Sequence, residues 1–153
     1  MSVSLKRILW PTDFSPLSMH GGKYADELRR QFGAELHVIY VIPTPLLPDA
    51  SGAMMGELPI TLNEPELLGV ARKHLDKLVD EQLGGDKSIK CEAFFGNPWL
   101  GICDYAQRNE IDMIVVATHG RTGLSYALIG STAEKIVRHA PCPVLTVKLA
   151  QKK

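Results

Sequence analysis

Short apolar runs alternate with helix-like patterns along the whole chain, and this alternation restricts the fold more than any other feature of the sequence. Between the runs lie segments with apolar residues at the i, i+3, i+4, i+7 spacing of a buried helix face. Strands that are separated by helices cannot pair as hairpins, so this order predicts a parallel sheet with helices on both faces. The predicted strands are residues 5–11, 35–42, 89–95, 111–117 and 143–147, and one helical set is Trp99, Ile102, Cys103 and Ala106.

Two of the predicted helices begin with the same signal. Ser15 precedes Pro16, and Asn97 precedes Pro98, which is the arrangement of a capping residue followed by proline at the first helical position. For the helix that follows Ser15 we expect a buried apolar stripe. Its members are Leu17, Tyr24, Ala25, Leu28 and Phe32.

The size and charge of the chain exclude several classes of protein. A chain of 153 residues is the size of one domain and can bury a full core. Lys and Arg number 17, and Asp and Glu also number 17, so there is no basic excess of the kind that nucleic-acid binders usually show. No apolar run approaches the roughly 20 residues that cross a membrane. We therefore expect no nucleic-acid or membrane partner.

The cysteines and the N-terminus favour a cytoplasmic location. Cys91, Cys103 and Cys142 form no CxxC pair, and such scattered thiols fit a reducing compartment. The apolar stretch near the N-terminus is too short for the core of a signal peptide. Within the single domain 1–153, residues 43–64 are rich in proline and lack periodicity, which predicts a mobile insertion that is either a lid over a site or a partner contact.

Polar residues follow two of the predicted strands, where ligands bind in sheets of this type. Pro11, Thr12 and Asp13 end the first strand, and the segment 118–121 (Thr118, His119, Gly120, Arg121) follows the fourth. A carboxylate at Asp13 could also simply cap the next helix. The five histidines show no metal-ligand spacing, and His37, inside a strand pattern, is expected to be structural.

The segment Gly130-Ser131-Thr132 opens the fourth predicted helix. Helix N-termini present unpaired N–H groups and the positive end of the dipole, and glycine lets a phosphate approach the backbone, so this segment suits an anion. The same segment also fits a capping box from Ser131 to Glu134, which needs no ligand. The residues alone leave both interpretations open.

Two stretches of the chain resemble one known family. ATHGRTGLSYALIGSTAEKIVRHAPCPVLTV, residues 117–147, resembles the C-terminal signature of the universal stress protein family, and ILWPTDFS, residues 8–15, resembles that family's first strand and turn. The resemblance implies an α/β fold of Rossmann-like, adenine nucleotide alpha-hydrolase type. In that fold a five-stranded parallel sheet has the strand order 3-2-1-4-5.

The family's nucleotide-binding branch has the pattern Gly-x2-Gly-x9-Gly-Ser/Thr. Gly120 and Gly130-Ser131 match its larger part, whereas its first glycine falls on Ala117. The site survives this departure if the position needs only a small residue, which is what we expect, and binding weakens if the position needs a backbone geometry that only glycine adopts. The resemblance implies ATP, together with Mg²⁺ held mostly by phosphates and water. The implied binding residues are Pro11, Thr12, Asp13, Val41, Ala117, Thr118, His119, Gly120, Arg121, Gly130, Ser131 and Thr132.

Within that set the resemblance implies separate roles. Asp13 and Thr12 would contact the ribose or adenosine part, and the backbone of Val41 would meet the adenine edge. The phosphates would lie among Gly120, Arg121, Gly130, Ser131 and Thr132.

The leading hypothesis is an ATP-binding stress-response sensor or regulator with at most slow hydrolysis, since nothing in the sequence marks a base aimed at a γ-phosphate. One alternative is a nucleotide-free dimeric interaction or protective module of the same fold, and another is a small phosphotransferase or hydrolase. The resemblance further implies a homodimer through the last strand, Pro143–Val147, and an unidentified regulatory protein partner.

Overall fold

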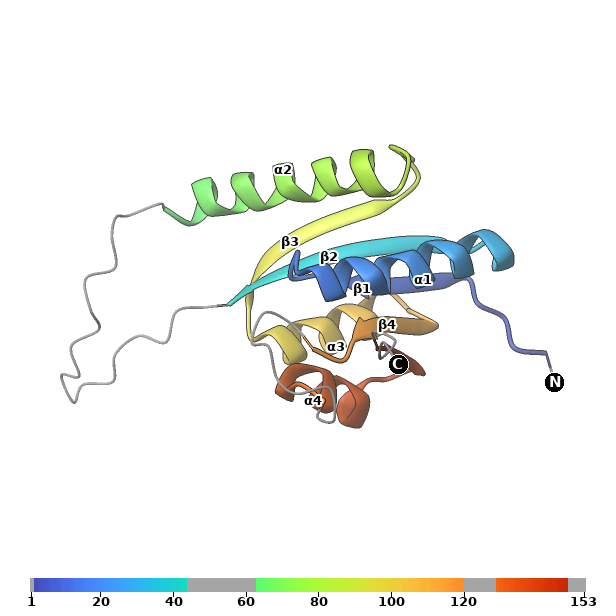
Figure 1. Cartoon of the computed structure of the whole chain (residues 1–153). Helices are drawn as coiled ribbons and strands as arrows, with labels where there is room; N and C mark the ends of the chain where they lie inside the picture. Colours follow the sequence, from blue (N-terminus) through green and yellow to red (C-terminus); the bar gives the residue numbers. More distant parts are fainter. Residues whose placement is uncertain (1, 44–62, 120–128, 149–153) are drawn as a thin grey trace, which may run out of the picture.

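The computed structural model describes residues 2–43, 63–119 and 129–148, which form a five-stranded parallel sheet flanked by helices (Figure 1). The strands lie in the order β3-β2-β1-β4-β5, and all neighbouring pairs are parallel. The predicted fold class is confirmed, strand order included. The elements are β1 Arg7–Pro11, α1 Pro16–Phe32, β2 Glu35–Pro43, α2 Glu64–Gln82, β3 Lys90–Gly96, α3 Pro98–Arg108, β4 Met113–Ala117, α4 Ser131–His139 and β5 Val144–Val147.

Two apolar clusters cover the two faces of the sheet. On one face, Trp10 of β1 packs in a cluster with Ala25 of α1 and Leu75 of α2. On the other face, the cluster contains Ile102 of α3 and Ile136 of α4. Helices α1 and α2 therefore lie on one side of the sheet, and α3 and α4 lie on the other.

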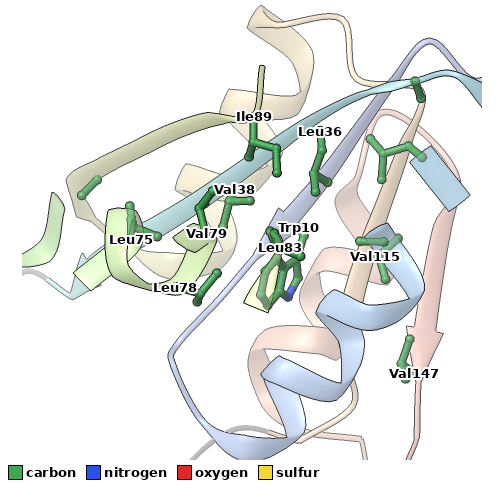
Figure 2. Packing of buried hydrophobic residues seen from close by; sticks show 14 of the residues in the cluster. Trp10, Leu36, Val38, Leu75, Leu78, Val79, Leu83, Ile89, Val115 and Val147 are labelled. Atoms are coloured by element: carbon green, nitrogen blue, oxygen red, sulfur yellow. The ribbon is translucent and has the colours of Figure 1, made fainter. Parts of the chain in front are cut away.

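Trp10 decides which residues of α1 can face the sheet. It is one of the largest fully buried side chains, and Figure 2 shows it within the cluster that includes Val79, Leu83 and Val115. An ideal Cβ at Gly22 would lie 2.4 Å from the indole ring, so glycine is needed there. The buried face of α1 accordingly consists of small residues, namely Ser18, Gly21, Gly22 and Ala25.

The expected apolar stripe on α1 is wrong at two positions. Tyr24 and Phe32 are 48% and 51% exposed, whereas Ala25 is fully buried. Helical periodicity selected the large apolar residues, but Trp10 already fills the space between α1 and the sheet. The helical set on α3 agrees better with the sequence, because three of its four members, Ile102, Cys103 and Ala106, are buried.

The predicted helix starts are confirmed. The Ser15 hydroxyl accepts from the Ser18 N–H at 3.2 Å, and the side chain of Asn97 caps α3. Helix α2 begins at Glu64, directly after its N-cap Asn63. Of the expected insertion at about 43–64, residues 44–62 lie outside the described residues, so its mobility stays a prediction.

His37 is buried in β2, and both of its ring nitrogens have partners. Nδ1 lies 2.8 Å from the Tyr105 hydroxyl, and Nε2 lies 2.6 Å from a Glu35 carboxylate oxygen. An ionised carboxylate only accepts, so Nε2–H donates to Glu35 and Nδ1 accepts from Tyr105. Burial lowers the pKa of His37, which favours the neutral ring. The structural role expected for His37 is confirmed.

No helix in the described part of the chain is long and apolar enough to span a membrane. Cys91, Cys103 and Cys142 are free cysteines. Burial raises the pKa of Cys91 and that of Cys142 to about 11.

Candidate functional site

A pocket of about 330 Å³ lies at the carboxyl ends of β1, β2 and β4, where α3 and α4 begin. Strand β1 has β2 on one side and β4 on the other, so this is the edge at which the winding of the sheet reverses. The volume is within the range of small-molecule sites.

Ten of the twelve candidate binding residues line this pocket. Gly120 and Arg121 lie outside the described residues. That the ten bind a ligand stays a prediction, but the fold brings segments from both halves of the chain together around one space. The ten are Pro11, Thr12, Asp13, Val41, Ala117, Thr118, His119, Gly130, Ser131 and Thr132.

Within the described part of the chain, eight further residues line the pocket without a ligand-binding signal in the sequence. Ile102, Ala133 and Ile136 also belong to the apolar cluster of α3 and α4, so the inner wall of the pocket is continuous with the core. These three residues lie about one turn inside helices that start at the strand ends, and that position could have predicted them from the sequence. The other five are Ser18, Tyr40, Pro43, Pro98 and Val116.

The loop after β1 is held by side chains that accept from its own backbone. Thr12 Oγ1 accepts from the Phe14 N–H at 3.0 Å and from the Ser18 hydroxyl at 2.9 Å. Phe14 has a φ of 63°, which is uncommon for a residue with a side chain and is a typical source of local strain near functional sites. Its ring packs edge-on against Tyr40 with centroids 4.9 Å apart.

Asp13 has a structural contact as well as a place in the pocket wall. One carboxylate oxygen accepts from the Ser15 N–H at 2.9 Å, which stabilises the turn into α1. The N-cap of α1 is Ser15 rather than Asp13. The carboxylate therefore supports the loop and also lines the pocket.

The start of α4 lies against the end of β4. The Gly130 N–H donates to the Thr118 carbonyl at 2.7 Å, and Thr118 Oγ1 lies 2.9 Å from His119 Nδ1. An ideal Cβ at Gly130 would lie 3.1 Å from the same carbonyl oxygen, so glycine permits this close approach.

Helix α4 starts differently from the other helices. Its N-cap is Gly130, which has no side chain, whereas Ser15, Asn63 and Asn97 cap α1, α2 and α3. Ser131 is the first helical residue, so the capping box that placed Ser131 at the N-cap is wrong by one position. The positive end of α4 lies at the pocket edge, with Ser131 and Thr132 in the lining.

Ala117, the departure from the family pattern, is the last residue of β4 and pairs with Val147 of β5. Among the described non-glycine residues, positive φ occurs at Phe14 and Glu110 and not at Ala117. The backbone here is therefore extended and needs no glycine. The remaining effect of alanine is one methyl group in the pocket lining.

The lining has a polar part and an apolar part. The polar residues Ser131 and Thr132 line the pocket from the start of α4 and His119 from just after β4, whereas the apolar residues Val41 and Ile102 line it from β2 and α3.

A family model and a curated relative both match this chain, and both belong to the same family. A family model described as the universal stress protein family matches residues 4–148. Universal stress protein MJ0531 of Methanocaldococcus jannaschii is 36% identical over 151 residues, which cover 96% of this chain and 84% of that protein.

Solved structures agree with the sequence comparison. The universal stress protein UspA from Lactobacillus plantarum has a TM-score of 0.70 and 25% identity, over 96% of this chain and 100% of that chain. A universal stress protein solved in complex with cAMP has the same fold, with a TM-score of 0.69 at 16% identity over 96% of this chain and 99% of that chain.

Proposed function

The chain belongs to the universal stress protein family, and on that premise we propose that it binds an adenine nucleotide in the pocket at the ends of β1, β2 and β4. ATP is the nucleotide that we propose first. The protein acts as a stress-response regulator, and its nucleotide-bound form presents a different surface to a protein partner, which requires that nucleotide binds the two forms with different affinity. We also assign it to the cytoplasm, in keeping with its free cysteines.

The observation that carries the proposal is the start of α4 at the pocket edge. Gly130, Ser131 and Thr132 lie in the lining, and a helix N-terminus favours a phosphate through its N–H groups and its dipole. The apolar surface of Val41 and Ile102 suits a purine ring. The complex of a related protein with cAMP supports an adenine nucleotide as the ligand class.

The remaining roles follow the same geometry. Asp13 lies at the end of β1 and is proposed to accept from the ribose hydroxyls. Mg²⁺ that arrives with ATP is held mostly by phosphate oxygens and water, as is usual for this ion. Gly120 and Arg121 are proposed as further phosphate contacts.

A titration with ATP, ADP, AMP, cAMP and adenosine tests the proposal, with and without Mg²⁺. Thermal unfolding and calorimetry report the stabilisation and the affinity. A ligand at a hundred times its dissociation constant stabilises by about 2.7 kcal/mol, which corresponds to a rise in melting temperature of very roughly 5–15 °C.

Ser131→Glu and Ser131→Gln form a matched pair for this titration. A carboxylate at the first residue of α4 interacts favourably with the helix dipole but repels a phosphate at the same place. We expect Ser131→Glu to keep or raise the melting temperature and to weaken ATP and AMP about tenfold relative to Ser131→Gln. Adenosine, which has no phosphate, should bind both variants alike. No saturable response to any of the five compounds would refute nucleotide binding.

A second candidate function is a dimeric interaction module, and the edge strand β5 favours it. The N–H groups of Ile114 and Thr118 bond to the carbonyls of Pro143 and Val147. Since residues alternate along a strand, the main-chain groups of Val144 and Thr146 point away from β4. We propose that a second copy of the chain pairs with this edge. Nucleotide binding and dimer formation are compatible in one protein.

A further inference from the structure

Gly101 of α3 lies closer to the sheet than a residue with a side chain could. An ideal Cβ at this position would lie 2.9 Å from Cε2 of Phe94, and 3.2 and 3.3 Å from the two Cγ atoms of Val41. Real Cβ atoms essentially never come within 3.0 Å of such a neighbour. Helix α3 therefore packs directly on the side chains of β2 and β3 through its backbone.

The backbone conformation does not require glycine here. Gly101 lies inside α3, and its N–H bonds to the Asn97 carbonyl at 2.8 Å as part of the first helical turn. Glycine weakens a helix interior relative to alanine, so a glycine at such a position has a packing reason rather than a conformational one. Gly69 of α2 is a useful contrast, since a Cβ there would meet no atom within 4 Å.

The Phe94 ring is held and cannot easily make room for a Cβ. It stacks on the Tyr105 ring with centroids 6.2 Å apart and planes 8° apart. The Tyr105 hydroxyl is in turn bonded to Nδ1 of buried His37 at 2.8 Å. A shift of Phe94 would disturb this chain of contacts.

Room for a Cβ at position 101 could also come from a movement of Val41 or of helix α3, and both movements change the pocket. Val41 is 6% exposed and lies in the pocket lining, so its displacement moves one wall. Helix α3 contributes Pro98 and Ile102 to the same lining, so an outward shift of the helix moves that part of the pocket wall.

We infer that Gly101 is a positioning residue for the ligand pocket: its direct contact with Val41 sets the distance between α3 and β2, and with it the width of the apolar part of the pocket. The packing of Gly101 against Val41 does not depend on a ligand, whereas the purine ring as the ligand rests on the proposed function. Gly101 touches no ligand itself. It acts through Val41 and Ile102.

Gly101→Ala tests the inference, with Gly69→Ala as the matched control for adding a methyl to a helical glycine. Calorimetry with adenosine and AMP gives the affinities, thermal unfolding is recorded separately, and the NMR shifts of the Val41 methyl groups report the pocket wall. We expect Gly101→Ala to weaken adenosine and AMP equally, by about tenfold, because both carry the base. Gly69→Ala should bind as the wild type does.

A rescue separates positioning from simple loss of structure. Phe94→Leu removes the ring atom that lies 2.9 Å from the added methyl. The double variant Gly101→Ala/Phe94→Leu should lose less affinity relative to Phe94→Leu than Gly101→Ala loses relative to the wild type, since the shortest contact is then absent while the two Val41 contacts at 3.2 and 3.3 Å remain. Wild-type affinity in Gly101→Ala, a loss that Phe94→Leu does not relieve, or a loss for AMP without one for adenosine would each overturn the inference.

The Val41 methyl shifts keep this test distinct from that of the proposed function. If the wild-type protein binds none of the five titrated compounds, the proposed function fails, and the Val41 methyl shifts alone then test the inference. The inference then requires that Gly101→Ala moves the Val41 methyl signals while Gly69→Ala leaves them in place. Unmoved signals in both variants would refute it.

Discussion

The indole of Trp10 lies against the backbone of Gly22 so closely that a Cβ at position 22 would come within 2.4 Å of Cη2 and Cζ2 of the ring. We expect Gly22→Ala to lower the free energy of unfolding by about 1–3 kcal/mol, the usual effect of overpacking a core. Urea unfolding of the wild type and of the variant measures this change in the free energy of unfolding.

Gly21→Ala is the control for this prediction. A Cβ at Gly21 would have its nearest neighbour at 3.7 Å, an ordinary contact distance. The gain in helix propensity should then raise stability by about 0.5–1 kcal/mol. Equal effects at the two positions would contradict the role given to Trp10.

Acidification should destabilise the fold through His37. Burial lowers the pKa of His37 below its ordinary value of 6.5, so the folded state favours the neutral ring. Between that lowered pKa and pH 6.5 the unfolded chain binds a proton that the folded chain does not. The stabilisation that depends on a neutral His37 is fully present above pH 6.5 and is lost as the pH falls through the pKa of His37 in the folded state.

His37→Gln isolates this contribution. Urea unfolding from pH 7.5 to 5 should show a smaller loss of stability in the variant than in the wild type. The pKa of Glu35 is lowered mainly by its hydrogen bond from His37, and it titrates below its ordinary value of 4.5, outside this range. An identical pH dependence in both proteins would count against the assignment.

The cysteine thiols should react slowly in the folded protein. Burial raises the pKa of Cys91 and that of Cys142 to about 11, and it also raises the pKa of Cys103, so little thiolate is present near neutral pH. Alkylation with iodoacetamide at pH 7.5, followed by mass spectrometry, should label all three far more slowly than in guanidinium chloride. Fast labelling of any one of them in the native protein would disprove the prediction for that thiol.

Thr146→Pro should abolish the proposed dimer without unfolding the protomer. Proline at position 146 removes an N–H that points to the open edge, because the residues bonded to β4 are the alternate ones. Light scattering at micromolar concentration should give a dimer mass for the wild type and a monomer mass for the variant. Leu145→Pro is the contrasting change, since it interrupts the pairing with β4 and should lower stability.

Ala117→Gly should leave nucleotide affinity within about twofold of the wild type, because the extended backbone at this position makes no demand for glycine. The same change should lower stability by about 0.5–1 kcal/mol, since glycine loses more backbone freedom on folding than alanine does. Calorimetry and thermal unfolding measure the two effects. A large gain in affinity would mean that the Ala117 methyl obstructs the ligand.

The order of elements and the place of the pocket were predictable from the sequence, because both follow from local periodicity and from the topology of parallel sheets. The exposure of Tyr24 and Phe32 was not predictable, because it depends on how Trp10 of another element fills space. The capping box placed the N-cap of α4 at Ser131, one residue too late, for a similar reason. Gly130 becomes the N-cap where its N–H bonds to Thr118, a contact between distant parts of the chain.

The central position of β1 has a consequence for how the protein is made. Strand β1 is synthesised before the other four strands of the sheet, yet one of its edges pairs with β4, in the register Ile8 with Met113. The cluster with α1 and α2 can form earlier, since of its buried members only Val115 and Val147 come after residue 93. A chain synthesised only as far as β3 would lack the strand that covers this edge of β1, so the middle of the future sheet, rather than its rim, would be open to other chains until β4 is made.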